Sequence, residues 1–315
     1  MKTVRWGIIG AGDVCERKSG PPLYKVDRSE LVLVHRRDRT AGEDFARRHA
    51  GRYVGSVDEL IASEEIDAVY VATPHALHAE QTIAALRAGK HVLVEKPMAL
   101  SAAECTAMID AAAEAGRALG VAYYRRGYPS IQKIRDLIDA ATIGTITAMS
   151  LNGQFPTSHR LDLVHYLLGD IESVRMVSGN DDGFRFERSA GRIQARVRRG
   201  NSHATITMSD TYAETGMPEA LILHGDAGSI YLTDLKGGSI TVTRTGADGS
   251  TELERIETGG LPYTHWGLVE NYVSHIIDST PLLCDGTEGR KSTVALDALA
   301  EADAGVEGWI AVEGV

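Results

Sequence analysis

One lysine stands where it could take part in proton transfer. The apolar run His91–Val94 leads directly into Glu95, Lys96 and Pro97. If this run is a strand of a parallel sheet, Lys96 emerges at the carboxyl edge, where such sheets collect their ligands. An amine there can hydrogen-bond, or donate a proton to, a hydroxyl or carbonyl group that is being interconverted. The alternative is an exposed lysine at a strand end, which is the commoner case for any single lysine.

A glycine-rich turn follows the first apolar run of the chain. Gly10 would permit the tight turn, and Gly12 would let the backbone approach a pyrophosphate. The charge of that group would lie against the backbone amides of Asp13 and Val14 at the start of the next helix. Cys15 occupies the third glycine position of this fingerprint and is small enough for close packing. Any glycine-bearing turn gives a similar pattern, but at the first strand of a β-α-β unit it predicts a bound dinucleotide.

Two arginines follow the second predicted strand, at the point where a Rossmann-type site contacts the adenosine ribose. An acidic side chain there selects NAD, whereas an arginine pairs with the 2′-phosphate of NADP. Arg36 and Arg37 therefore favour NADP(H). Two alternatives remain: both arginines are solvated surface charges, or Asp38 serves the ribose of NAD.

The elements that would position these groups alternate through the first part of the chain. Short β-branched runs predict strands at Val4–Ile9, Glu30–His35, Ala68–Ala72, His91–Val94 and Ala118–Ala122. Alanine-rich segments between them predict helices at Gly42–Ala50, Val57–Ala62, Leu77–Ala88 and Ala102–Ala115. This alternation predicts parallel pairing with right-handed crossovers, and hence a doubly wound α/β domain over residues 1–121.

The second part of the chain, residues 122–315, has a different texture. Helices are predicted at Pro129–Ala140, Ser158–Leu168, Trp266–Ile277 and Arg290–Ile310. Strands separated by turn residues are predicted at Val174–Ser178, Arg192–Arg198, His203–Asp210, Ala220–His224, Ser229–Thr233, Ser239–Thr245 and Glu252–Glu257. This pattern is typical of an antiparallel sheet in an α+β domain.

Composition narrows the class of protein. The chain has 315 residues, 43% hydrophobic and 24% charged, with a formal net charge of −10. This balance fits two globular domains and makes a nucleic-acid partner a poor expectation. Three widely spaced cysteines suit neither a disulfide framework nor a metal site, and no apolar run reaches membrane-spanning length. We therefore expect a cytoplasmic protein with no metal and no membrane partner.

Four segments together carry a family resemblance. They are Gly7–Gly12, Val71–His75 with His78 three residues further on, Gly89–Pro97 and Ile143–Ile146. In this combination the chain resembles the Gfo/Idh/MocA oxidoreductase family over nearly its whole length. The resemblance implies a Rossmann domain followed by a domain with a large open antiparallel sheet, which often makes dimer or tetramer contacts. It also implies hydride transfer between NAD(P) and a hydroxyl or carbonyl carbon of a sugar, polyol or related small molecule.

The resemblance also assigns roles by matching position. It implies that Thr73, Pro74 and His78 lie along the nicotinamide half of the cofactor, that Glu95 and Lys96 stand at the reacting centre, and that Tyr124 and Arg125 lie near cofactor and substrate.

The chain departs from the family pattern at the first helix of the second domain. Dehydrogenases of the family carry Asp-x-x-x-His-x-x-Asp there, and this chain has Phe155, His159 and Asp162 at those three positions. The loop over residues 150–158 is also shorter than usual. His159 and Asp162 are candidate catalytic residues on one helix face, with the aspartate orienting the imidazole. The alternative is a solvent-exposed first turn with Ser158 as N-cap.

Without the first aspartate, the usual Asp-His relay cannot operate in that form. We expect Lys96 and His159 to handle the proton, with Tyr124 as a further donor. The leading hypothesis is an NADP(H)-dependent sugar or polyol oxidoreductase. One alternative is a sensor or regulatory protein that binds NAD(P) without catalysis, and a weaker one is elimination or glycoside cleavage in which the cofactor is recycled.

Overall fold

The chain divides into two compact units. The computed structural model describes residues 2–153, 156–178, 192–199, 202–209, 219–246, 248–303 and 308–314. By contacts, the first unit comprises residues 1–127 and 262–293, and the second comprises residues 128–261 and 294–315. The predicted division at residue 122 places residues 262–293 in the second domain, whereas by contacts they belong to the first unit.

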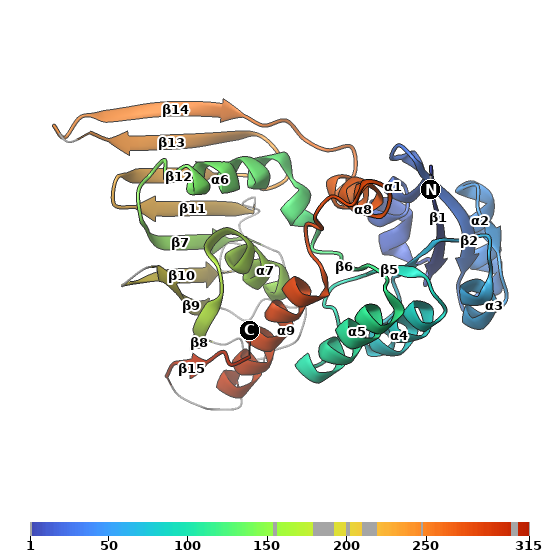
Figure 1. The fold of residues 1–315 in the computed structure, drawn as a ribbon. Helices are drawn as coiled ribbons and strands as arrows, with labels where there is room; N and C mark the ends of the chain where they lie inside the picture. The colour runs from blue at the N-terminus through green and yellow to red at the C-terminus, as the bar shows by residue number, and fades with distance from the viewer. Residues whose placement is uncertain are drawn as a thin grey trace. The chain divides into compact units, whose positions relative to one another are not determined.

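The first unit is built on a parallel sheet (Figure 1). Its strands are β1 (Val4–Ile9), β2 (Ser29–His35), β3 (Arg52–Tyr53), β4 (Ala68–Val71), β5 (His91–Val94) and β6 (Leu119–Val121). Among the described residues the sheet has six strands in the order β3-β2-β1-β4-β5-β6, and every pair is parallel. This is the strand order of dinucleotide-binding domains, and the predicted doubly wound fold is confirmed.

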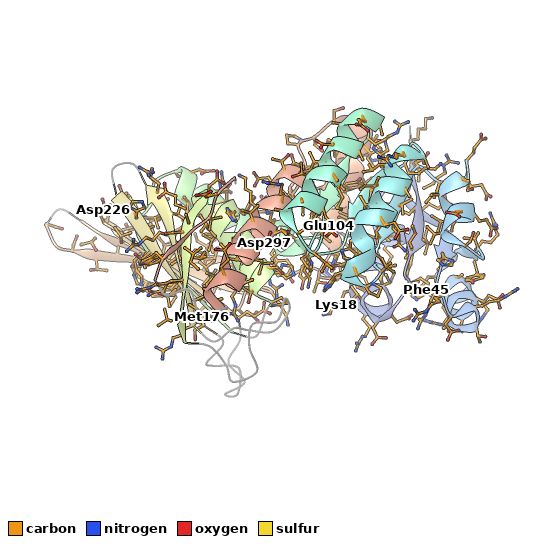
Figure 2. All side chains as sticks on the ribbon, turned by 90° about the horizontal axis from the view of Figure 1, so that it is seen from below. Lys18, Phe45, Glu104, Met176, Asp226 and Asp297 are labelled. Carbon is orange, nitrogen blue, oxygen red and sulfur yellow. The ribbon has the colours of Figure 1, made fainter. Side chains whose placement is uncertain are left out.

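Helices cover both faces of this sheet. They are η1 (a π-helix, Cys15–Ser19), α1 (Pro22–Lys25), α2 (Arg39–Arg48), α3 (Val57–Ala62), η2 (His75–Leu77), α4 (His78–Arg87), α5 (Ala102–Ala115), η3 (Tyr124–Gly127) and α8 (Trp266–Asp278). Because strand side chains alternate, Ile9 and Val71 join a core with α3, α4 and α5, while Ile8 and Tyr70 join a core with α1, α2 and α8. Helices α4 and α5 lie side by side (Figures 1 and 2).

Helix α8 explains why residues 262–293 belong to the first unit. The rings of Tyr272 and Trp6 lie 5.5 Å apart between centroids, and the Tyr272 hydroxyl donates to the Ala118 carbonyl at 3.1 Å. Helix α8 therefore packs on one face of the parallel sheet and helps to bury its apolar side chains, such as Trp6 and Leu93.

A partly buried histidine at the start of β5 makes stability depend on pH. Burial, with the charges of Arg117 and His275, lowers the pKa of His91 to about 4, and its Nδ1 accepts the Ala118 N–H at 3.1 Å. Below its usual pKa of about 6.5 the unfolded chain binds more protons than the folded one, so stability falls as the pH drops from 7 to 5. We expect a loss of about 1 kcal/mol from this partly exposed group.

Urea unfolding of wild type and His91→Asn at pH 7 and pH 5 tests this expectation. An asparagine keeps an acceptor near Ala118 but does not titrate in this range. Between pH 7 and pH 5 the stability of His91→Asn should therefore fall less than that of wild type. Equal losses in the two proteins would contradict the assignment.

The second unit is built on a mostly antiparallel sheet (Figure 1). Its strands are β7 (Ile146–Asn152), β8 (Ile171–Ser178), β9 (Arg192–Arg199), β10 (Ser202–Ser209), β11 (Ala220–Gly225), β12 (Gly228–Leu232), β13 (Ser239–Thr245), β14 (Thr251–Glu257) and β15 (Ile310–Ala311). Its helices are α6 (Pro129–Asp139) and α7 (Thr157–Leu168), with α9 (Gly286–Asp303) beginning in the first unit. In the part of the chain that is described, nine strands follow the order β14-β13-β12-β11-β7-β10-β9-β8-β15. The predicted large antiparallel sheet is confirmed.

Two predictions about this unit are wrong in detail, and one alternative does not hold. Residues 150–152 belong to β7, not to a loop, and β7 pairs with β10 in parallel. Ile310 lies in β15 against Val174, so the last helix does not reach it. Ser158 is buried inside α7, which begins one residue earlier, so the exposed first turn with Ser158 as N-cap does not form.

Cys15, Cys105 and Cys284 are buried, and none of the three forms a disulfide. None of the helices among the described residues combines the length and apolar character that a membrane span needs.

Candidate cofactor and active site

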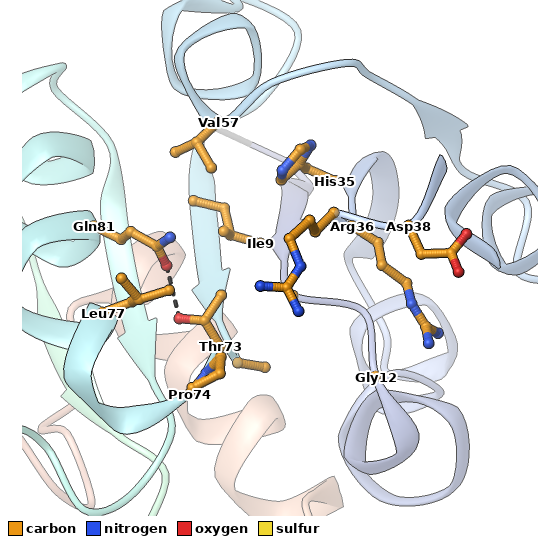
Figure 3. Close-up of a pocket in the computed structure, with 13 residues that line it drawn as sticks. Ile9, Gly12, His35, Arg36, Asp38, Val57, Thr73, Pro74, Leu77 and Gln81 are labelled. Atoms are coloured by element: carbon orange, nitrogen blue, oxygen red, sulfur yellow. Dashed lines mark hydrogen bonds between the residues drawn. The ribbon is translucent and has the colours of Figure 1, made fainter. Parts of the chain in front are cut away.

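A cavity of about 610 Å³ opens at the carboxyl edge of the parallel sheet. It lies where the strand order reverses, between β1 and β4, which is where doubly wound sheets bind ligands. Residues from the ends of β1, β2 and β4 and from α3, η2 and α4 line it (Figure 3): Ile9, Gly10, Gly12, His35, Arg36, Arg37, Asp38, Val57, Ala72, Thr73, Pro74, Leu77 and Gln81. Six of the predicted cofactor residues are thus brought together.

The glycine-rich turn fits a pyrophosphate. Gly10 has a φ of +89°, and a Cβ there would come within 2.7 Å of Thr73 Cγ2. The fold therefore requires a glycine at this position, whether or not a cofactor binds. A Cβ on Gly12 would meet nothing nearer than the Gly10 carbonyl oxygen at 3.9 Å. Gly12 is therefore not needed for packing, and its missing side chain leaves room in the cavity. Asp13 and Val14 are exposed just beyond the turn and do not line the cavity.

The end of β2 presents cations to this cavity. Arg36 extends toward the turn, and its Nη1 donates to the Ala11 carbonyl at 3.0 Å (Figure 3). Arg37 is exposed at the cavity wall. Asp38 caps α2, with its carboxylate accepting the Ala41 N–H at 3.0 Å. Asp38, the acidic residue in the described lining, thus also serves as the N-cap of α2.

The loop after β4 forms the other side of the cavity. Thr73 and Pro74 line it, and the Thr73 hydroxyl donates to Gln81 Oε1 at 2.7 Å (Figure 3). His78 lies behind this lining, fully buried, with Nδ1 2.9 Å from the Pro97 carbonyl and Nε2 2.9 Å from the Thr73 carbonyl. Burial lowers the pKa of His78, although both carbonyls favour its charged form. His78 therefore ties together the loops after β4 and β5 instead of contacting the cavity.

The Glu-Lys-Pro segment sits at the same sheet edge. Ile9, Val71 and Val94 are in register across β1, β4 and β5, so Gly10, Ala72 and Glu95 leave the sheet at one level. Lys96 follows, half-buried, and the Lys96–Pro97 peptide bond is cis.

Glu95 itself does not face the cavity. Its carboxylate accepts hydrogen bonds from the Tyr70 hydroxyl and from the Lys96 N–H, and it lies 3.1 Å from His265 Nε2. Burial raises the pKa of a carboxyl group, but the hydrogen bonds of His265 and Tyr70 and the charges of His265 and Lys96 lower that of Glu95 to about 2. Glu95 is therefore a buried carboxylate held by its neighbours.

The stretch after β6 carries the predicted aromatic and arginine. Arg125 is buried and its Nη1 donates to the Tyr124 hydroxyl at 3.1 Å. The Tyr124 ring lies 4.2 Å from the His265 ring between centroids. Both predicted residues thus join the first unit's network, next to the histidine that contacts Glu95.

The second unit holds the other predicted catalytic residues. His159 and Asp162 are on α7 and are fully buried. Phe155, the main departure from the family pattern, falls outside the residues that the structure describes. The catalytic roles of His159 and Asp162 stay predictions.

Two residues of this region have no sequence motif that assigns them a role. Gln81 lies on α4, and its side chain lines the cavity beside Leu77. His265 has no motif around it, and only the return of residues 262–293 brings it to Glu95. Within the described ranges, no cluster of three or more His, Cys, Asp or Glu side chains has the arrangement of a metal site.

Comparisons with known proteins agree with this geometry. Residues 4–123 match the Gfo/Idh/MocA family model, described as an oxidoreductase family with an NAD-binding Rossmann fold. Oxidoreductase P35 of Formosa agariphila is 28% identical, with 93% of this chain and 97% of that protein aligned. The 1,5-anhydro-D-fructose reductase of Ensifer adhaerens is 31% identical, with 79% of this chain and 82% of that protein aligned.

A solved structure shares the whole fold. An oxidoreductase from Agrobacterium radiobacter, in complex with NAD+, L-tartaric acid and magnesium, superimposes with a TM-score of 0.82 over 98% of both chains at 16% identity. The family model, a relative that is 31% identical over 79% of this chain and the site at the strand-order reversal lead to one conclusion: the chain belongs to the Gfo/Idh/MocA family of NAD(P)-binding oxidoreductases.

Proposed function

We propose that this oxidoreductase uses NADP(H) to interconvert a hydroxyl and a carbonyl group on a sugar, polyol or related small molecule, with Lys96 as the proton-handling residue. The register that brings Gly10, Ala72 and Glu95 out of the sheet at one level carries the proposal, because Lys96 follows at the same edge. The relative from Ensifer adhaerens, named as a reductase of a keto sugar, supports the substrate class. Relatives that align over most of their length and are named as an oxidoreductase and a reductase favour catalysis over the sensor alternative.

Different residues of the cavity would contact different parts of the cofactor. The turn at Gly10 and Gly12 would hold the pyrophosphate, and Arg36 with Arg37 would pair with a 2′-phosphate. The loop with Thr73 and Pro74 would flank the nicotinamide. When bound, the nicotinamide supplies or accepts the hydride.

Lys96 carries out the accompanying proton transfer. In the reducing direction its ammonium donates a hydrogen bond to the carbonyl oxygen and gives up a proton as that oxygen becomes a hydroxyl. In the oxidising direction the amine takes the proton back. His159, Asp162 and Tyr124 are proposed to assist at the substrate.

Turnover tests this role directly. The purified protein is assayed with NADPH on 1,5-anhydro-D-fructose and a panel of keto sugars and inosose ketones, and with NADP⁺ on the matching alcohols. On the best substrate, Lys96→Ala should lower kcat by about 100- to 10,000-fold. Lys96→Arg keeps the positive charge but cannot release a proton at neutral pH, so it should lose kcat as well. Undiminished turnover in Lys96→Ala would refute the assigned role.

Two wider expectations stay proposals. Homodimer or homotetramer formation through the second unit's sheet is testable by light scattering. A cytoplasmic location is testable by fractionation of the native host.

A further inference from the structure

A buried group of three side chains is hydrogen-bonded to the backbone of Lys96 through the carboxylate of Glu95. Glu95 is 7% exposed, Tyr70 is fully buried and His265 is 1% exposed. Tyr70 and His265 both contact Glu95 Oε1, the first through its hydroxyl and the second through Nε2 at 3.1 Å. The other carboxylate oxygen, Oε2, accepts the backbone N–H of Lys96 at 3.1 Å. The Glu95 carboxylate thus joins two other segments of the first unit, β4 and the residue before α8, to the peptide from which the Lys96 side chain starts.

His265 is held firmly in its place. It is the residue before α8, and its Nδ1 lies 3.0 Å from the Thr264 hydroxyl while its ring packs on Tyr124. The backbone at the start of α8 packs closely against the backbone at the end of η3. A Cβ added to Gly267 would lie 2.5 Å from the Gly127 carbonyl oxygen, so there is no room for a side chain between them. Such close packing leaves the imidazole little freedom to move away from Glu95.

The hydrogen-bond donors around Glu95 keep its carboxylate charged without any ligand. Burial of a lone carboxylate is costly, and here it is compensated by donors from β4, from the α8 entry and from the backbone. The low pKa of Glu95 agrees with this, since it keeps the group ionised at any pH near neutrality. Its fixed position is therefore available to orient its neighbour in the chain.

We propose that Tyr70, Glu95 and His265 form a positioning triad that holds Lys96 in its working place, and that His265 is a positioning residue for the reaction. This inference rests on the proposed function, in which Lys96 handles the proton. Neither Glu95 nor His265 lines the cofactor cavity, so the triad should affect turnover more than dinucleotide binding. A displacement of a reacting group by about 1 Å can cost on the order of 100-fold in rate.

The central experiment compares two substitutions of His265. His265→Leu removes the contact with Glu95 Oε1, and we expect kcat with NADPH to fall by about 10- to 100-fold on the substrate identified above, with Kd for NADPH changed less than about threefold. His265→Gln can present an amide N–H near the same place and should recover most of the loss. Tyr70→Phe, which deletes only a hydroxyl, provides a second variant should His265→Leu fail to fold.

A matched control lies on the same helix. His275 is in the last turn of α8, where its Nδ1 contacts the Thr280 carbonyl at 2.7 Å, away from Glu95. His275→Leu should leave kcat unchanged, whatever its effect on stability. Equal losses of kcat in the two leucine variants would show that His265 acts through the stability of α8 and would overturn the triad.

A second readout does not depend on turnover. The rate at which acetic anhydride labels Lys96, followed by peptide mass spectrometry, should change severalfold in His265→Leu and return in His265→Gln. Labelling of exposed Lys25 should not change. Labelling of Lys96 that is the same in all variants would overturn the triad.

The outcomes separate the two proposals. If Lys96→Ala retains full turnover, the proposed function fails. If Lys96→Ala loses turnover while His265→Leu and Tyr70→Phe keep it, the triad alone fails. If the triad acts through Lys96, His265→Leu in the Lys96→Ala background should cause no further loss, whereas an independent structural effect would add to it.

Discussion

Gly10→Ala should lower the free energy of unfolding by on the order of 3 kcal/mol, while Gly12→Ala should leave it unchanged. Gly10 has a φ of +89°, and its new Cβ would stand 2.7 Å from Thr73 Cγ2 and 2.8 Å from the Ala72 carbonyl group. The backbone of Ala72 belongs to the exit of a buried strand and cannot yield without disturbing the sheet. At Gly12 the nearest atom would be 3.9 Å away.

The same two substitutions should have separable effects on binding. The Gly12 methyl group would enter the cavity, so Gly12→Ala should weaken NADPH binding by about tenfold without loss of stability. Urea unfolding gives the stabilities, and quenching of intrinsic fluorescence by NADPH gives Kd. Normal NADPH affinity in a stable Gly12→Ala protein would contradict pyrophosphate binding at this turn.

Arg36→Asp should reverse the proposed preference for NADP(H). An arginine paired with a 2′-phosphate contributes a charge-assisted interaction, so its loss should weaken NADPH binding by about 10- to 100-fold. The introduced carboxylate can accept hydrogen bonds from the ribose hydroxyls of NADH and repels the 2′-phosphate, so NADH binding should improve. Stability should change little, because Arg36 is partly exposed and bonds one carbonyl, that of Ala11.

A control for charge is available three residues later. Arg39 is exposed at the start of α2, pairs with Glu43 and does not line the cavity. Arg39→Asp makes the same change in net charge and should leave the ratio of the two Kd values as in wild type. If wild type already binds NADH as tightly as NADPH, or Arg39→Asp shifts the ratio as far as Arg36→Asp, the preference for NADP(H) is refuted.

Local patterns predicted the first unit well. The bounds predicted for β1, α3, α5 and β5 agree with the structure at both ends. These elements have strong alternation or alanine-rich periodicity and are flanked by turn residues, and nearby contacts are enough to define them. The cofactor cavity was also predictable, because it depends on strand ends whose position follows from parallel pairing.

Features that depend on distant pairing were harder to predict. β7 was not expected as a strand, and its central place comes from partners β10 and β11 far along the chain. The start of α9 was placed too late because Asp285, whose carboxylate accepts the Glu288 N–H, was not recognised as a cap. Glu95 was expected at the reacting centre, but its burial depends on Tyr70 and His265, which no local motif connects to it.

The return of α8 to the parallel sheet also sets an order for biosynthesis. Trp6 and Leu93 pack in a core that includes Leu268 and Tyr272 of α8, so that core stays incomplete until the ribosome has synthesised residue 278. By then the strands β7 to β14 have already been made. The cofactor-binding unit, although its chain is translated first, is therefore finished only after most of the second sheet is available to fold.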